Sequence, residues 1–186
     1  MAREEDESFS QHLSRIRELR REGDVAGLAA VANDVTVDAL LQRRAIRALG
    51  KTRDVAAVEP LSNCVNRPDH DDRIAAARAL ARLQREESVP ALLRTVHDPH
   101  PIVAAWAADG LGKLGDRAAV PTLIKALRSD EWQLRAAAAR ALGKIGGADA
   151  IAALNRVRQQ ERGRKRFWIT RALWAARRQE RPLELT

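Results

Sequence analysis

Two histidines stand three positions apart, at His97 and His100, and could in principle bind a metal ion. A zinc site normally needs four ligands, and no further histidine or cysteine follows at a suitable spacing. The segment His97-Asp98-Pro99-His100 is more typical of a turn whose aspartate caps the next helix. The segment His70-Asp71-Asp72 has the same interpretation. The sequence therefore predicts no metal site.

Cys64 is the single cysteine and a second candidate for chemistry. It aligns with Thr95, Ala126 and Val157 of a repeated pattern, which favours a small buried thiol over a nucleophile. The two Gly-x-x-Gly segments, 112–115 and 143–146, follow predicted helices, whereas nucleotide-binding glycine loops follow strands. We expect no cofactor.

A repeat organises the chain. Leucines recur 31 positions apart, four of them within Arg-Ala-Leu-Gly or a related sequence: Leu49, Leu80, Leu111, Leu142 and Leu173. A fixed period between 20 and 50 residues is the signature of a solenoid.

Each repeat is predicted to contain two helices. The first helices begin near a Val-Pro pair, as at Pro90 and Pro121, because proline is favourable in the first helical turn. The second helices place Ala and Leu at i,i+4 on a buried face. The glycines around 112 and 143 allow close packing and left-handed helix ends. The predicted repeats span about 24–50, 54–82, 86–113, 117–146 and 149–178.

The ends of the chain differ from the repeats. Residues 8–22 form an amphipathic pattern with apolar residues at Phe9, Leu13, Ile16 and Leu19, typical of a capping helix, with a partner-binding helix as the alternative. We expect a disordered acidic segment at 1–7, a single array over 8–178 and a loose tail at 179–186.

The segment Arg-Ala-Ala-Ala-Ala-Arg-Ala-Leu-Gly-Lys-Ile-Gly at 135–146, together with Val-Pro-x-Leu-Ile at 120–124, resembles short HEAT-like repeats of the phycobilin-lyase type. This resemblance covers about residues 24 to 178. It implies an all-α fold, a right-handed α-α superhelix of about five helix pairs plus an N-terminal capping helix, with second helices lining the concave side. Asp72 replaces the usual apolar residue and Trp174 the usual glycine, so less regular packing is expected there.

Composition limits the partners. The 186 residues carry a formal net charge of +8, which favours acidic proteins, nucleic acids or anionic lipid. A single cysteine and the absence of an apolar run of about 20 residues indicate a soluble protein of the cytoplasm without membrane insertion.

The outward positions of the second helices are basic. With Leu142 and its equivalents as reference, helical geometry turns offsets −6, −5, −2 and +2 away from the core. Half of these 20 residues are Lys or Arg, and Asp109 is the one acid among them. The predicted partner-binding residues are Arg43, Arg44, Arg47, Lys51, Arg78, Arg82, Trp106, Asp109, Lys113, Arg140, Lys144, Phe167, Trp168 and Arg171.

A basic concave face with interspersed aromatic rings has several uses. It suits a non-enzymatic scaffold that binds an acidic protein or peptide, because arginine pairs bidentately with carboxylates. It also suits DNA or RNA, whose bases stack on aromatic rings. The sequence leaves both open.

An enzymatic alternative rests on four of these residues. Trp106, Asp109, Arg140 and Trp168 are similar in arrangement to the cleft of HEAT-like alkylpurine DNA glycosylases, which would make Asp109 a stabiliser of positive charge on the sugar. This chain is shorter than that family, and its repeats differ. Asp109 is also explained as an ion-pair partner of Lys113, Arg78 or Arg140.

Further arginines are expected to be structural. Those at offset −7, Arg73, Arg135 and Arg166, are predicted to form ion pairs with loop aspartates between repeats. The basic C-terminal segment contains Phe167, Trp168 and Trp174. It could cap the array or mediate contact with another protein or self-association.

Overall fold

The computed structural model describes residues 2–160 and 164–179 and, within these, no side chains for 2–8 and 164–166. Over this part of the chain helices are the only regular secondary structure, so the predicted all-α fold class is confirmed. A terminal helix, α1 (Ala2–Glu22), is followed by five helix pairs. The helix α1 begins six residues before the capping helix expected from the sequence.

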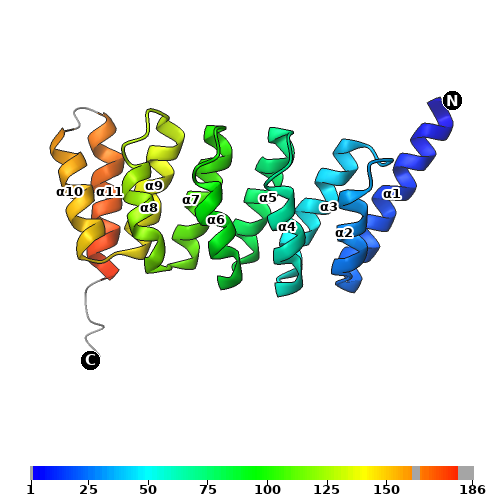
Figure 1. Ribbon diagram of the computed structural model, residues 1–186, viewed down its shortest axis with the longest axis horizontal. Helices are drawn as coiled ribbons and strands as arrows, with labels where there is room; N and C mark the ends of the chain where they lie inside the picture. Colours follow the sequence, from blue (N-terminus) through cyan, green and yellow to red (C-terminus); the bar gives the residue numbers. More distant parts are fainter. Residues whose placement is uncertain (1, 161–163, 180–186) are drawn as a thin grey trace. The chain divides into compact units, whose positions relative to one another are not determined.

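Each pair has a first and a second helix (Figure 1). The first helices are α2 (Val25–Asn33), α4 (Val58–Cys64), α6 (Val89–Thr95), α8 (Val120–Ala126) and α10 (Ala148–Gln160). The second helices are α3 (Ala39–Thr52), α5 (His70–Leu83), α7 (Pro101–Leu114), α9 (Trp132–Ile145) and α11 (Arg164–Gln179). Short 3-10 helices η1 (Val55–Ala57), η2 (Glu86–Ser88) and η3 (Arg117–Ala119) precede α4, α6 and α8.

The chain forms two compact units, residues 1–88 and 89–186. The N-terminal unit contains α1 to α5, and the C-terminal unit contains α6 to α11. Within each unit, successive helix pairs lie side by side in sequence order (Figure 1). The expected single array over residues 8–178 stays a prediction, and all of the expected tail except residue 179 lies outside the described residues.

The ends of the second helices follow from local chemistry. Asp69 is the N-cap of α5, and its carboxylate accepts hydrogen bonds from the backbone N–H groups of Asp71 and Asp72. These bonds hold the pKa of Asp69 below its ordinary value. Pro101 occupies the first turn of α7, and Gly115 ends that helix with a φ of +75°. Glycine adopts this left-handed conformation without strain.

Glycines bring successive second helices into close contact. A Cβ atom at Gly112 of α7 would lie 2.5 Å from the Cα of Ala141 on α9. A Cβ atom at Gly143 would lie 2.7 Å from the carbonyl oxygen of Ala172 on α11. Neither position can therefore carry a side chain without moving the neighbouring helix. The predicted role of these glycines in close packing is confirmed.

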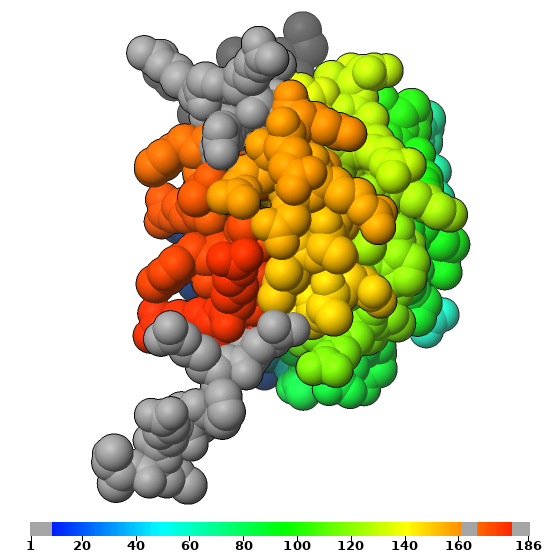
Figure 2. Space-filling model, turned by 90° about the vertical axis from the view of Figure 1, so that its left-hand side faces the viewer, coloured from blue at the N-terminus to red at the C-terminus, as the bar shows by residue number. Residues whose placement is uncertain are grey.

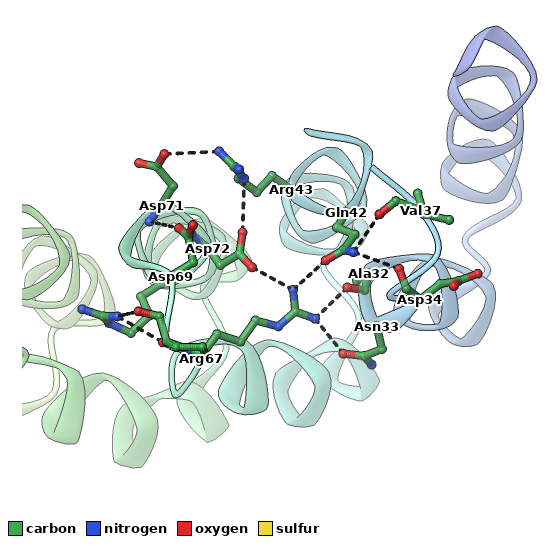
Figure 3. A network of polar contacts seen from close by, with 12 residues as sticks. Ala32, Asn33, Asp34, Val37, Gln42, Arg43, Arg67, Asp69, Asp71 and Asp72 are labelled. Carbon is green, nitrogen blue, oxygen red and sulfur yellow. Dashed lines mark hydrogen bonds and ion pairs between the residues drawn. The ribbon is translucent and has the colours of Figure 1, made fainter. Parts of the chain in front are cut away.

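A buried ionic network ties the helices of the N-terminal unit together (Figure 3). Asp72 of α5 is 8% exposed and forms ion pairs of 3.2 Å with Arg43 of α3 and with Arg67. Arg67, in the connection between α4 and α5, also donates to the backbone oxygen of Ala32 at 2.6 Å and to Asn33 Oδ1 at 2.8 Å. Asp72 therefore links α5 to α2 and α3 through two arginines.

None of the described helices combines the length and the apolar character needed to cross a lipid bilayer.

Candidate functional site

Exposed cations occupy equivalent positions on neighbouring second helices of the N-terminal unit. Arg47 and Lys51 of α3 are exposed, and so are Arg78 and Arg82 of α5, which stand 31 residues later. The two helices pack closely because a Cβ at Gly50 would lie 2.6 Å from the Cα of Ala79. Equivalent offsets on adjacent, closely packed helices place these four cations on one face.

The same face borders an open groove between α1 and α3. The groove has a volume of about 1420 Å³. Its cationic lining residues are Arg15, Arg17, Arg20, Arg21, Arg44, Arg47 and Lys51. Among the described residues Glu18 is the one acid in the lining, and it pairs with Arg15 at 3.2 Å. The groove therefore has a strongly positive lining.

The floor of this groove is apolar. Ile16 of α1 is 6% exposed and Ala48 of α3 is 5% exposed, and Leu13 lies beside them half-buried. None of the described residues that line the groove is aromatic. A ligand that suits it must offer negative charge at the rim and small apolar groups at the base.

Sequence reasoning named residues on the α3 side of this groove and none on the α1 side. Arg44, Arg47 and Lys51 were predicted as partner-binding residues, and the structure brings them together with Arg17 and Arg20. The spacing of the α1 arginines, one turn apart and beside Ile16, was visible in the sequence. That spacing could not show that this face of α1 lies opposite α3.

Arg43 serves the packing of the unit. Its side chain is 22% exposed and forms ion pairs with Asp71 and Asp72 of α5, each at 3.2 Å. Offset −5 was expected to turn away from the core, but in two of the second helices it faces inward, because Ala75 and Ala137 are buried at that position. Arg44, at offset −5 of α3, remains exposed.

In the C-terminal unit, Asp109 of α7 accepts two hydrogen bonds from Arg140 of α9. The distances are 2.9 Å from Nη2 to Oδ2 and 3.3 Å from Nε to Oδ1. The ion-pair interpretation of Asp109 is therefore confirmed, with Arg140 as the partner.

The remaining predicted residues of this unit differ in exposure. Lys113, Lys144 and Arg171 are exposed on α7, α9 and α11. Trp106 and Trp168 are half-buried, whereas Phe167 is 73% exposed. A partner could therefore reach these three cations and Phe167 more fully than the two tryptophans.

The arginines at offset −7 hold the loops of their own repeats. Arg73 donates to the carbonyl oxygens of Arg67 and Pro68 at 3.1 and 2.7 Å, and Arg135 donates to that of Ser129 at 2.6 Å. The expected ion pairs between these arginines and loop aspartates of other repeats stay a prediction. The side chain of Arg166 lies outside the described residues.

The other candidates for chemistry lie in structural positions. Asp98 accepts a hydrogen bond of 2.8 Å from the backbone of His100 and closes the turn between α6 and α7. Cys64 is fully buried, and this burial raises the pKa of its thiol. Among the described residues no three His, Cys, Asp or Glu side chains gather as a metal site would require.

Consecutive helix pairs whose second helices pack at a regular spacing of 31 residues define a helical-repeat protein. A sequence model of HEAT repeats matches residues 25–100 and 92–174. The chain therefore belongs to the HEAT-repeat family, as its repeat motif indicated. No curated protein matches the sequence.

Several solved structures share the fold. An engineered protein is 23% identical with a TM-score of 0.64, over 87% of this chain and 81% of its own. A designed armadillo repeat protein in complex with the peptide (KR)4 is 17% identical with a TM-score of 0.65, over 91% and 90%. Human deoxyhypusine hydroxylase is 19% identical with a TM-score of 0.50, over 90% and 80%. At these identities the likeness concerns the fold alone.

Proposed function

We propose that the protein is a non-enzymatic interaction scaffold that binds an acidic segment of a partner protein. The binding surface is the groove between α1 and α3, extended by the exposed cations of α5. The observation that carries the proposal is the lining of this groove, where the described residues include seven cations and one acid.

Electrostatics favours an anionic ligand at this site. Clefts lined by one sign of charge focus the field and raise the local concentration of the opposite charge. Guanidinium groups also present paired donors that match the two oxygens of a carboxylate. Arg20 and Arg21 of α1 and Arg44 and Arg47 of α3 provide such donors in the lining of one groove.

The floor favours a polypeptide over a nucleic acid. Single-stranded nucleic acids gain affinity by stacking bases on aromatic side chains. The part of the lining that the structure describes contains no aromatic ring, whereas Leu13, Ile16 and Ala48 can accept small apolar side chains. An acidic peptide with interspersed apolar residues satisfies both the rim and the floor.

The fold is compatible with a charged peptide ligand. The designed armadillo repeat protein with a similar structure was solved with the basic peptide (KR)4. The groove of this chain would need an acidic peptide instead, because its own lining is basic. The α1 side of the groove extends from Ser10 to Arg21, a helical length of about 18 Å that an extended peptide of about six residues would span.

The test uses fluorescence anisotropy with labelled (DE)4 peptide and, in parallel, single-stranded DNA and RNA of equal charge. The variant Arg20→Ala/Arg47→Ala removes one cation from each side of the groove. The control Arg117→Ala/Arg128→Ala removes two exposed arginines of the C-terminal unit and changes the net charge equally.

We expect (DE)4 binding to weaken at least tenfold in the groove variant and to stay within about twofold in the control, because only the groove variant loses ligand contacts. Equal loss in both variants would show attraction to net charge alone and refute the site. Tighter binding of DNA or RNA with the groove variant unaffected would replace the proposal with nucleic-acid binding elsewhere on the chain.

A further inference from the structure

The last helix, α11, exposes two large aromatic side chains. Phe167 is 73% exposed and Trp174 is 65% exposed. The guanidinium of Arg178 lies over the indole ring of Trp174, 5.6 Å from its centroid. Phe167 and Trp174 are seven positions apart, which places them on the same side of the helix.

The position of Trp174 in the repeat shows which way this side faces. Trp174 stands 31 residues after Gly143 and 62 after Gly112, where the internal second helices approach their next neighbour. On α11, Ala172 meets Gly143 of α9. Trp174 follows two residues later, about 200° around the helix, so it points away from α9.

Among the described residues, no helix follows α11 in the C-terminal unit, and its outer side ends that unit. Viewed from that end, α10 and α11 form its outermost layer (Figure 2). On α7 and α9 the equivalent side is covered by the next second helix. An indole cannot pack at the close glycine distance, so a further repeat of the same geometry does not fit here.

The charges around the aromatics select the partner. Arg171, Arg177 and Arg178 are exposed on the same helix, and residues 167–179 contain no acidic side chain. Two copies of this helix face to face would bring arginines together, and like charges in an interface are costly. A partner that covers the aromatics must instead carry carboxylates.

We propose that the outer side of α11 docks an acidic amphipathic helix of a partner protein. Phe167 and Trp174 are the apolar anchors, and Arg171 and Arg178 pair with carboxylates on the docked helix. The occupant is a helix because the equivalent sides of α7 and α9 each receive one. This surface is independent of the groove between α1 and α3, since it lies on the other unit.

The probe is a hydrocarbon-stapled helical peptide with leucines on one side and glutamates on the other, titrated against the full chain by calorimetry. We expect binding that Phe167→Ala/Trp174→Ala weakens at least tenfold, because buried aromatic anchors dominate such interfaces. The matched control is Trp132→Ala on α9, which removes a tryptophan of similar exposure, 66%. It should leave binding within about twofold of the wild type.

A second variant tests the charge requirement without altering the aromatics. Arg171→Glu/Arg178→Glu should lose the glutamate peptide and gain affinity for the same peptide built with lysine. Absence of binding to the wild type, equal loss with Trp132→Ala or an unchanged preference after charge reversal would each overturn the proposal.

Two further outcomes would assign the surface to another occupant. A dimer in sedimentation that Trp174→Ala dissociates would show that a second copy covers α11. Peptide binding that requires deletion of residues 180–186 would show that the chain's own C-terminal segment does. Either result refutes the proposal of an acidic partner helix, and neither bears on the groove between α1 and α3.

Discussion

Replacement of Arg67 by methionine should destabilise the N-terminal unit strongly. Methionine keeps most of the aliphatic volume and removes the charge and all donors. The wild-type guanidinium donates to Ala32 and Asn33 at the end of α2 and pairs with Asp72 at 3.2 Å. The side chains of Arg67 and Asp72 are only 18% and 12% exposed, so solvent replaces these contacts poorly.

The expected loss follows from these contacts. Hydrogen bonds from a charged donor contribute about 1.5 kcal/mol or more each, which gives about 3 kcal/mol for the two bonds to α2. Asp72 retains its ion pair with Arg43, so the penalty for leaving its carboxylate buried is smaller than in an isolated pair. We therefore expect a decrease of about 3 kcal/mol in the free energy of unfolding.

Urea denaturation followed by two signals measures this loss. Far-ultraviolet circular dichroism reports helices of both units, whereas tryptophan fluorescence reports the C-terminal unit, which holds all four tryptophans. The control is Arg15→Met, which removes an exposed ion pair whose side chains are 58% and 46% exposed. Its expected cost is under about 0.5 kcal/mol.

The double variant Arg67→Met/Asp72→Leu separates a specific network from general packing. Removing both charges avoids a carboxylate with too few partners, so the double variant should lose less stability than the sum of the single variants. The reasoning is refuted if Arg67→Met costs no more than Arg15→Met, or if the two network substitutions are additive.

Two other substitutions test the helix contacts and the helix cap. Gly112→Ala should lower the free energy of unfolding by about 2 kcal/mol, since its Cβ would lie 2.5 Å from the Cα of Ala141. Gly→Ala inside a helix normally stabilises, so a higher melting temperature would contradict the close contact. The pKa of Asp69 is lower in the folded chain than in the unfolded chain. The stability that its carboxylate contributes is therefore complete above the unfolded pKa of about 4, and it is lost as the pH falls through the pKa of the folded chain. Asp69→Asn keeps a capping oxygen and should flatten the fall in melting temperature below about pH 4; an unchanged slope would show that other carboxylates cause it.

The repeat could be predicted from the sequence because the residues that define it lie close together in the chain. Leucines such as Leu111 and Leu142 recur at a fixed period, and both are fully buried. Gly112 and Gly143 stand at the predicted close contacts between second helices. Periodicity and small residues on one side of a helix determine such contacts without knowledge of the partner helix.

The polar contacts were harder to predict because they depend on how neighbouring elements are aligned with one another. Asp72 was expected to disturb packing, yet it is held by Arg67 from the preceding connection and by Arg43 from α3. The face of α1 that carries Arg17 and Arg20 could not be assigned to a site, since the apolar pattern of α1 shows which face packs but not which helix borders it. Long arginine side chains reach several partners, and spacing alone does not select among them.

The glycine contacts also have a consequence for the engineering of the array. Because Gly112 meets Ala141 and Gly143 meets Ala172 at the same repeat positions, a duplicated internal 31-residue segment would present matching small residues at both of its new junctions. An added internal repeat should therefore find compatible neighbours on both sides. The indole of Trp174 replaces the small residue at this position of α11, so lengthening this protein by design should start from an insertion before α10.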